Sequence, residues 1–149
     1  MSPPKIAPGT SVRKCMSRRV ITVGPDTGLA QAAKLMRARK IRHLPVVESR
    51  GRLIGIVTSR DLRQALFAPA VQDRSEDVLD VLNALLVRDV MTRGVVTVRA
   101  ATTLREAARL MHERKLGALP VVENDRLVGI LTETDVLDAF QRLLGKAAT

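Results

Sequence analysis

Apolar positions along the chain follow two spacings, one typical of short strands and one typical of helices. The β-branched run at residues 20–23 predicts a strand, and the Gly-Pro pair after it predicts where the strand ends. A helix is expected next, because apolar residues recur at i, i+3, i+4 and i+7 from Leu29 to Met36. Asp26 or Thr27 is placed to cap that helix.

Two further apolar runs predict two more strands. The run at residues 44–47 contains Pro45, which favours an edge or entry position. The run at residues 53–57 is apolar throughout, which is typical of a strand buried on both faces. A short helix is expected to begin near Ser59. After a loop at residues 66–74, an apolar stripe predicts another helix, over residues 75–86.

The whole pattern occurs twice. Shifted by 75 residues, Leu44-Pro45-Val46-Val47-Glu48 falls on Leu119-Pro120-Val121-Val122-Glu123. In the second copy Thr103 and Glu106 form a capping-box pattern. A unit of ~50 residues buries too little surface to be stable alone. We therefore expect an α/β (α+β) fold in which two β-α-β-β-α units, related by a pseudo-twofold axis, pack through their sheets into one module.

The repeat also sets the expected organisation of the chain. The ranges are an N-terminal tail at 1–9, a first unit at 10–66, a connecting loop and helix start at 67–80, a second unit at 81–141 and a C-terminal tail at 142–149.

Composition narrows the class of protein. With 46% apolar and 27% charged residues, the chain is typical of a globular protein, and no run approaches the length of a membrane span. The first residues lack the apolar run of a secretory signal, so we expect a cytoplasmic protein. The single cysteine, Cys15, excludes an internal disulfide and is interpreted as a small, partly buried apolar residue.

The net charge of +10 is concentrated in the first half of the sequence. Residues 1–74 carry 15 Lys and Arg against 4 Asp and Glu, whereas residues 75–149 carry 10 against 11. This asymmetry fits an anion site, a one-sided polyanion surface or a solvated basic face. The only aromatic residues are Phe67 and Phe140, which argues against stacking of single-stranded nucleic acid.

Catalytic and metal-binding motifs are not found in the sequence. The two histidines, His43 and His112, have no metal-ligand spacing, and His112 is expected to face solvent. There is no nucleophile elbow, P-loop or dinucleotide glycine cluster. We therefore predict no enzyme activity, no catalytic residue and no metal.

The most specific motif is a buried strand that turns directly into a helix, Gly55 to Asp61. A helix N-terminus offers backbone N–H groups to a phosphate, and Thr58 adds a hydroxyl donor. Asp61 can accept both hydroxyls of a ribose, and the glycine would leave space for a base. The second copy has Thr132 and Asp135. The alternative is purely structural, because Thr-x-x-Asp is also a helix-capping pattern.

The ordered motifs resemble a tandem pair of CBS (cystathionine β-synthase) domains, together called a Bateman module. The first set comprises Met16, Leu29, Leu44-Pro45-Val46-Val47 and Gly55 to Asp61; the second comprises Val90-Met91, Leu104, Leu119-Pro120-Val121-Val122 and Gly129 to Asp135. The resemblance covers about residues 10–140. It implies clefts that bind an adenosine ligand such as AMP, ADP, ATP or S-adenosylmethionine, with the Asp on ribose and the Thr near phosphate.

Carried over by position, the resemblance implies the following ligand-binding residues. They are Ile21, Thr22, Val23, Arg42, His43, Leu44, Pro45, Thr58 and Asp61 in one set, and Val96, Thr97, Val98, Ala118, Leu119, Pro120, Thr132 and Asp135 in the other. Because Arg42-His43 corresponds to Gly117-Ala118, one cleft is expected to hold several phosphates better than the other.

The resemblance implies a stand-alone regulatory module that needs no cofactor, binds an adenine nucleotide and signals to a protein partner in trans. A homodimer through helices is expected, with residues 78–86 part of the contact. One alternative is a scaffold whose clefts are empty. A second is a basic protein that binds nucleic acid, an interaction that would weaken steeply with salt.

Overall fold

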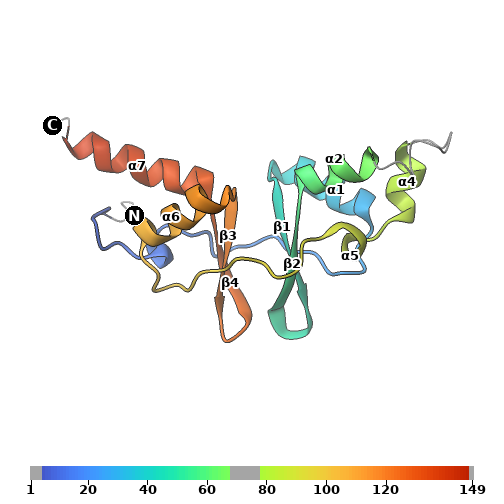
Figure 1. Cartoon of the computed structure of the whole chain (residues 1–149), viewed down its shortest axis with the longest axis horizontal. Helices are drawn as coiled ribbons and strands as arrows, with labels where there is room; N and C mark the ends of the chain where they lie inside the picture. Colours follow the sequence, from blue (N-terminus) through green and yellow to red (C-terminus); the bar gives the residue numbers. More distant parts are fainter. Residues whose placement is uncertain (1–4, 68–77, 148–149) are drawn as a thin grey trace. The chain divides into compact units, whose positions relative to one another are not determined.

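The structure is a computed structural model that describes residues 5–67 and 78–147 (Figure 1). Its elements are η1 (Val12–Lys14), α1 (Leu29–Arg39), β1 (His43–Glu48), η2 (Ser49–Gly51), β2 (Arg52–Thr58), α2 (Ser59–Leu66), α4 (Val78–Ala84), α5 (Val87–Val90), α6 (Leu104–Arg114), β3 (Ala118–Glu123), β4 (Arg126–Thr132) and α7 (Glu133–Ala147). None of the described helices is long and apolar enough to cross a membrane.

The chain forms two compact units whose limits differ from those of the sequence repeat. The central unit comprises residues 21–95, and the terminal unit comprises residues 1–20 together with 96–149. The segment that begins each repeat therefore packs with the remainder of the other repeat. The first such segment ends at residue 20 and lies in the terminal unit, and the second ends at residue 95 and lies in the central unit. These two are called the exchanged segments below. Val12 donates its N–H to Thr102 O at 2.7 Å, and Val87 donates to Thr27 O at 2.8 Å, so the two exchanged segments are held by corresponding main-chain bonds.

The exchange removes the charge asymmetry seen along the sequence. The central unit carries 12 Lys and Arg against 8 Asp and Glu, and the terminal unit carries 13 against 7. The net charges are therefore +4 and +6, because the basic residues at 13–19 belong to the terminal unit. The excess positive charge does not single out one unit as the anion site.

Each unit is built on one antiparallel hairpin. In the central unit β1 pairs with β2, with His43 opposite Thr58 and a bulge between Val46 and Val47. In the terminal unit β3 pairs with β4 in the same register, Ala118 opposite Thr132. The strands predicted from the apolar runs are confirmed in both copies.

The strand predicted at residues 20–23 is reduced to a single parallel bridge between Val23 and Val46. Val23 donates to Pro45 O at 3.1 Å and accepts from Val47 N at 2.9 Å. The prediction of a full strand was wrong, because Val23 alone in this run makes the ladder hydrogen bonds with β1. Val98 repeats this bridge with Val121.

The cap predicted for the first helix is also wrong. The N-cap of α1 is Gly28, which has no side chain to offer. The Thr27 hydroxyl accepts from Gly24 N at 3.1 Å in the preceding turn, and Asp26 forms an ion pair with Arg88. Both side chains therefore stabilise the approach to the helix.

The corresponding cap of α6 is confirmed in part. Thr103 accepts from Glu106 N at 3.2 Å, as the capping pattern predicts. The Glu106 carboxylate instead pairs with Arg109, so the reciprocal half of the box is not formed.

The helix predicted at residues 75–86 is shorter than expected. α4 ends at Ala84, and Leu86 is extended and is the N-cap of α5. Ser75, where that helix was expected to begin, lies outside the described residues. Leu82 and Leu85 pack against the core of the central unit, and α4 contacts α1 and α2. This part of the stripe therefore packs within its own unit, and its part in a dimer contact stays a prediction.

Two separate apolar clusters form the cores. In the central unit the completely buried side chains include Leu29, Ala32, Leu44, Val46, Val57 and Val87. In the terminal unit they include Val12, Ala107, Leu119, Val121 and Leu131. Val12 and Val87, the anchors of the exchanged segments, are both 0% exposed, so each core is complete only with a segment from the other repeat.

The strand glycines make room for the exchanged segments. A Cβ on Gly55 would lie 2.8 Å from Met91 Sδ and 3.0 Å from Thr92 O. A Cβ on Gly129 would lie 2.6 Å from Met16 Sδ and 3.0 Å from Ser17 O. The expectation that Gly55 leaves space for a base was wrong, because main chain and a methionine fill that space.

We predict that Gly55→Ala and Gly129→Ala each lower the free energy of unfolding by about 1–3 kcal/mol, the usual cost of overpacking. Gly145→Ala is the matched control. It lies in α7, where an added methyl group would have nothing within 4 Å, and should raise stability by up to about 1 kcal/mol through helix propensity. Urea unfolding followed by circular dichroism measures all three, and an equal effect at the three sites would contradict the close-approach argument.

Candidate functional site

The Thr58–Asp61 pair forms a closed hydrogen-bonded box at the start of α2. Asp61 Oδ2 accepts from Thr58 N at 2.8 Å and from Thr58 Oγ1 at 3.0 Å. Asp61 N in turn donates to Thr58 Oγ1 at 3.2 Å. The capping role that the pattern suggested is therefore real.

The second copy has the same box at the start of α7. Asp135 Oδ2 accepts from Thr132 N at 2.9 Å and from Thr132 Oγ1 at 3.1 Å. In both boxes the bonds described use Oδ2 alone. A carboxylate has a second acceptor oxygen, so capping leaves Oδ1 available for another donor.

Most backbone N–H groups at the start of α2 and of α7 already have hydrogen-bond partners, so each helix offers an anion little more than one free N–H group. At α2 the N–H of Thr58 and of Asp61 are used in the box, and Ser59 N donates to Arg42 O at 2.9 Å. At α7 Glu133 N donates to Gly117 O at 3.0 Å, so the same amides are engaged there. The predicted backbone phosphate cradle does not form, and a phosphate would depend on side-chain charge.

The candidate residues of the central unit gather at one end of its hairpin. His43 opens β1 directly opposite Thr58, which closes β2. Arg42 is tied to the first turn of α2 through its carbonyl, one residue from Thr58. Val23 bridges Val46 on the other side of β1. Arg42 and Asp61 therefore belong to the same unit.

The terminal unit repeats this arrangement without the basic pair. Ala118 takes the place of His43 opposite Thr132, and Gly117 takes the place of Arg42 at the helix start. Val98 lies beside β3 as Val23 lies beside β1. The two sets are thus alike in backbone and different in charge.

Burial divides the candidate residues into two groups. The partly or fully exposed group comprises Ile21, Thr22, Arg42, His43, Thr58 and Asp61, with Val96, Thr97, Thr132 and Asp135. The buried group comprises Val23, Leu44 and Pro45, with Val98, Ala118, Leu119 and Pro120. The first group presents side-chain atoms to solvent, whereas the second is buried and contributes packing.

The sequence patterns did not predict that residues of the exchanged segments lie beside the candidate site. Thr92 pairs with Ile56 on β2, and Ser17 pairs with Ile130 on β4. Their partners Ile56 and Ile130 lie two residues before Thr58 and Thr132, so Thr92 and Ser17 lie beside the strand ends that carry the two boxes. The repeated methionine before each, Met91 and Met16, was part of the motif, but its contact with a strand glycine of the other repeat could not be seen from spacing.

Cys15 lies in the terminal unit near the start of α7. Burial raises the pKa of its thiol, and the nearby Asp135 and Asp138 carboxylates raise it further against the lowering effect of Arg142. Within the described residues no three His, Cys, Asp or Glu side chains are grouped to hold a metal ion. The Cys15 side chain packs against the apolar core of the terminal unit.

This fold, a duplicated unit in which a hairpin runs into a capped helix, defines the class as a tandem α/β repeat. The CBS domain family matches residues 10–68 and 87–142, and the chain belongs to that family. It is 38% identical over 134 residues to a CBS domain-containing protein of Dictyostelium discoideum, a match that covers 89% of this chain and 92% of that protein. Several longer curated relatives are spanned for less than a quarter of their length.

Two solved CBS pairs share the fold. CBSX2 from Arabidopsis thaliana, solved in complex with AMP, is 33% identical with a TM-score of 0.77; the match covers 91% of this chain and 99% of that one. The CBS domain pair of protein MJ0100, solved in complex with 5′-methylthioadenosine and S-adenosyl-L-methionine, is 30% identical with a TM-score of 0.74. The match covers 88% of this chain and 99% of that one.

We predict that Cys15 reacts slowly with a thiol reagent in the folded protein. At pH 8 an ordinary thiol near its pKa is partly thiolate, whereas the raised pKa of Cys15 keeps it protonated and burial limits access. Labelling with 5,5′-dithiobis(2-nitrobenzoic acid) should be at least several-fold faster after unfolding in urea. Equal rates in the folded and unfolded protein would show that the thiol is exposed and ionised.

Proposed function

We propose that this chain is a regulatory module that binds an adenosine ligand and changes its affinity for a protein partner when it does. The observation that carries the proposal is the repeated Thr–Asp box, in which Oδ2 caps a helix while Oδ1 of a partly exposed Asp is left to accept ribose hydroxyls. That CBSX2 was solved with AMP and that the CBS pair of MJ0100 was solved with 5′-methylthioadenosine and S-adenosyl-L-methionine supports the choice of an adenosine compound.

The box explains how one residue serves stability and binding together. A cap fixes the side-chain torsions of Asp61 and Asp135 before any ligand arrives. A preorganised acceptor loses less conformational freedom on binding than a free carboxylate on the surface. Each unit therefore offers its ligand one rigid acceptor, at the end of its hairpin.

The neighbouring side chains support a difference in ligand class between the two units. Arg42 and His43 stand beside Thr58, and both can carry positive charge toward a phosphate. Gly117 and Ala118 stand beside Thr132 and offer none. We therefore expect the central unit to prefer a phosphorylated adenosine and the terminal unit to accept an adenosine whose 5′ group carries no phosphate.

Thermal unfolding followed by circular dichroism tests the proposal, since the chain has no Trp or Tyr for fluorescence. A ligand at 100 times its Kd adds about 2.7 kcal/mol, which should raise the midpoint by about 5–10 °C for a chain of this size. AMP, ATP and S-adenosylmethionine are compared. No shift with any of the three at millimolar concentration would overturn the proposal and leave a scaffold with structural caps.

The discriminating variants are Asp61→Asn and Asp135→Asn. An Asn side chain keeps an oxygen to accept the Thr N–H, so the cap survives, but its second group is an amide that donates. Each variant should unfold within about 2 °C of the wild type without ligand, because the cap is retained, and should lose the ligand-induced shift of its own unit. Arg42→Ala should weaken binding of ATP more than of S-adenosylmethionine.

A further inference from the structure

Exposed cations of the central unit gather on α1, on the turn that follows it and on α2. α1 has no acidic residue, and Asp61, the single acid of α2, is engaged in the box with Thr58. The exposed cations of these elements are Lys34, Arg37, Arg39, Lys40, Arg42, Arg60 and Arg63. These seven residues are called the cationic face below.

The elements that carry the cationic face form one connected surface. α1 and α2 contact each other, and Figure 1 shows them beside the same hairpin. Ser59 N donates to Arg42 O at 2.9 Å, so the main chain of Arg42 lies beside the residue that precedes Arg60. None of the seven side chains forms an ion pair with another described residue. Their positive charge is therefore available to a binding partner.

The corresponding first helix of the terminal unit balances its charge internally. Arg109 of α6, which corresponds to Lys34, forms ion pairs with Glu106 and Glu113 of the same helix. At the positions of these two acids α1 has Gln31 and Ala38. The two helices therefore share a backbone and differ in the charge they present.

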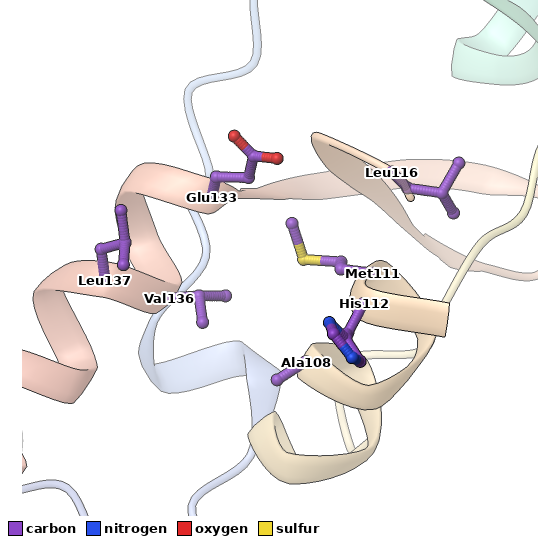
Figure 2. Close-up of a pocket in the computed structure, with 7 residues that line it drawn as sticks. All are labelled: Ala108, Met111, His112, Leu116, Glu133, Val136 and Leu137. Carbon is purple, nitrogen blue, oxygen red and sulfur yellow. The ribbon is translucent and has the colours of Figure 1, made fainter. Parts of the chain in front are cut away.

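The second helix differs between the units in the same way. Thr134 and Leu137 of α7 stand at the positions of Arg60 and Arg63. Leu137 and Glu133 line a mostly apolar hollow of about 250 Å³ between α6 and α7 (Figure 2). Since both units have the same fold, the fold does not require cations at these positions.

Helix stability does not account for the whole cationic face. Arg37 and Arg39 lie in the last turn of α1, where a cation interacts favourably with the helix dipole. Arg60 lies in the first turn of α2, where the dipole disfavours a positive charge. A departure from the local rules of stability is typical of a functional surface.

The composition of the cationic face favours an acidic protein segment as its partner. Five of the seven cations are arginines, and a guanidinium can bind a carboxylate through two parallel hydrogen bonds. Phe67 is 70% exposed and follows Arg60 and Arg63 at spacings of seven and four residues, so it extends the same side of α2. Arginine and aromatic residues are enriched at protein–protein interfaces.

Nucleic acid and membrane fit this surface less well. Single strands bind to several stacked aromatic side chains, and Phe67 is the only aromatic residue of the central unit. The phosphates of a duplex would make no use of Phe67. A helix that lies on a membrane needs a broad apolar face, whereas Phe67 is the only large apolar side chain exposed in the described part of this unit.

We propose that the cationic face binds an acidic segment of a protein partner, with carboxylates on its arginines and an apolar side chain against Phe67. The proposal rests on the proposed function only for the existence of a protein partner, and it does not require an adenosine ligand. It adds the chemistry by which that partner is recognised.

Fluorescence polarisation with an acidic peptide tests the proposal. The probe repeats Glu-Glu-Leu-Glu over about 12 residues and carries fluorescein, in about 0.1 M salt so that distant charges are screened. A peptide with Gln in place of Glu should not bind. The experiment contains no adenosine compound, so its failure is separate from a failure of the ligand-induced thermal shift.

The discriminating variant is Arg60→Glu with Arg63→Glu. It should weaken binding of the acidic peptide by about tenfold or more, because two attractive charges become repulsive. Arg105→Glu with Arg126→Glu is the matched control, since both are exposed cations of the terminal unit that pair with no described residue. It changes the net charge equally and should weaken binding by less than about threefold.

Phe67→Ala keeps the test valid if the double variant does not fold, which circular dichroism shows. Its side chain is largely exposed, so the fold should survive, and binding of the acidic peptide should weaken by about threefold or more. No binding of wild type up to about 1 mM peptide, or an equal loss in the two double variants, overturns the proposal. Tighter binding of a DNA duplex of equal charge, or of vesicles that contain phosphatidylserine, would overturn it in favour of a nucleic acid or a membrane.

Discussion

The structure depends on the main-chain pairing of each repeat's leading segment with the other repeat. Val12 and Val87 are completely buried in cores to which they do not belong by sequence. Ser17 and Thr92 then each exchange two main-chain hydrogen bonds with a strand of the other repeat, Ser17 with Ile130 and Thr92 with Ile56. Since neither core is closed without the exchanged segment, neither repeat can fold as an independent piece of sequence.

This pairing also constrains the candidate site. Thr92 lies beside Ile56, two residues before Thr58, and the glycine between the packed chains has no room for a side chain. A backbone held this closely fixes the end of β2 and hence the turn into α2. The Thr58–Asp61 box then sets the direction of the carboxylate. The close main-chain contact of Thr92 with β2 therefore helps to preorganise the Asp61 carboxylate as an acceptor.

Much of the fold could be predicted because the duplication doubled every local signal. The hairpins, α1 and α6 were confirmed, since their apolar periodicity is set locally. The strand at 20–23 and the caps at Asp26 and Thr27 were wrong, because those residues satisfy partners in the preceding turn or in the exchanged segment. The exchange of segments depends on contacts between residues far apart in the sequence, which no local pattern encodes. It also spreads the excess positive charge of the first half over both units, so that charge no longer indicates which unit holds an anion site.

The site was predictable in its residue types and less so in its geometry. Thr-x-x-Asp was open to a capping and a binding interpretation, and the structure shows a cap that uses Oδ2, which leaves Oδ1 for the ligand of the proposed function. The amides expected to bind phosphate were counted as free because spacing does not reveal the carbonyls of Arg42 and Gly117. Because those amides are engaged, the proposed function assigns discrimination among phosphorylated ligands to side chains. A duplicated fold can therefore keep two identical caps while its two ends diverge in charge.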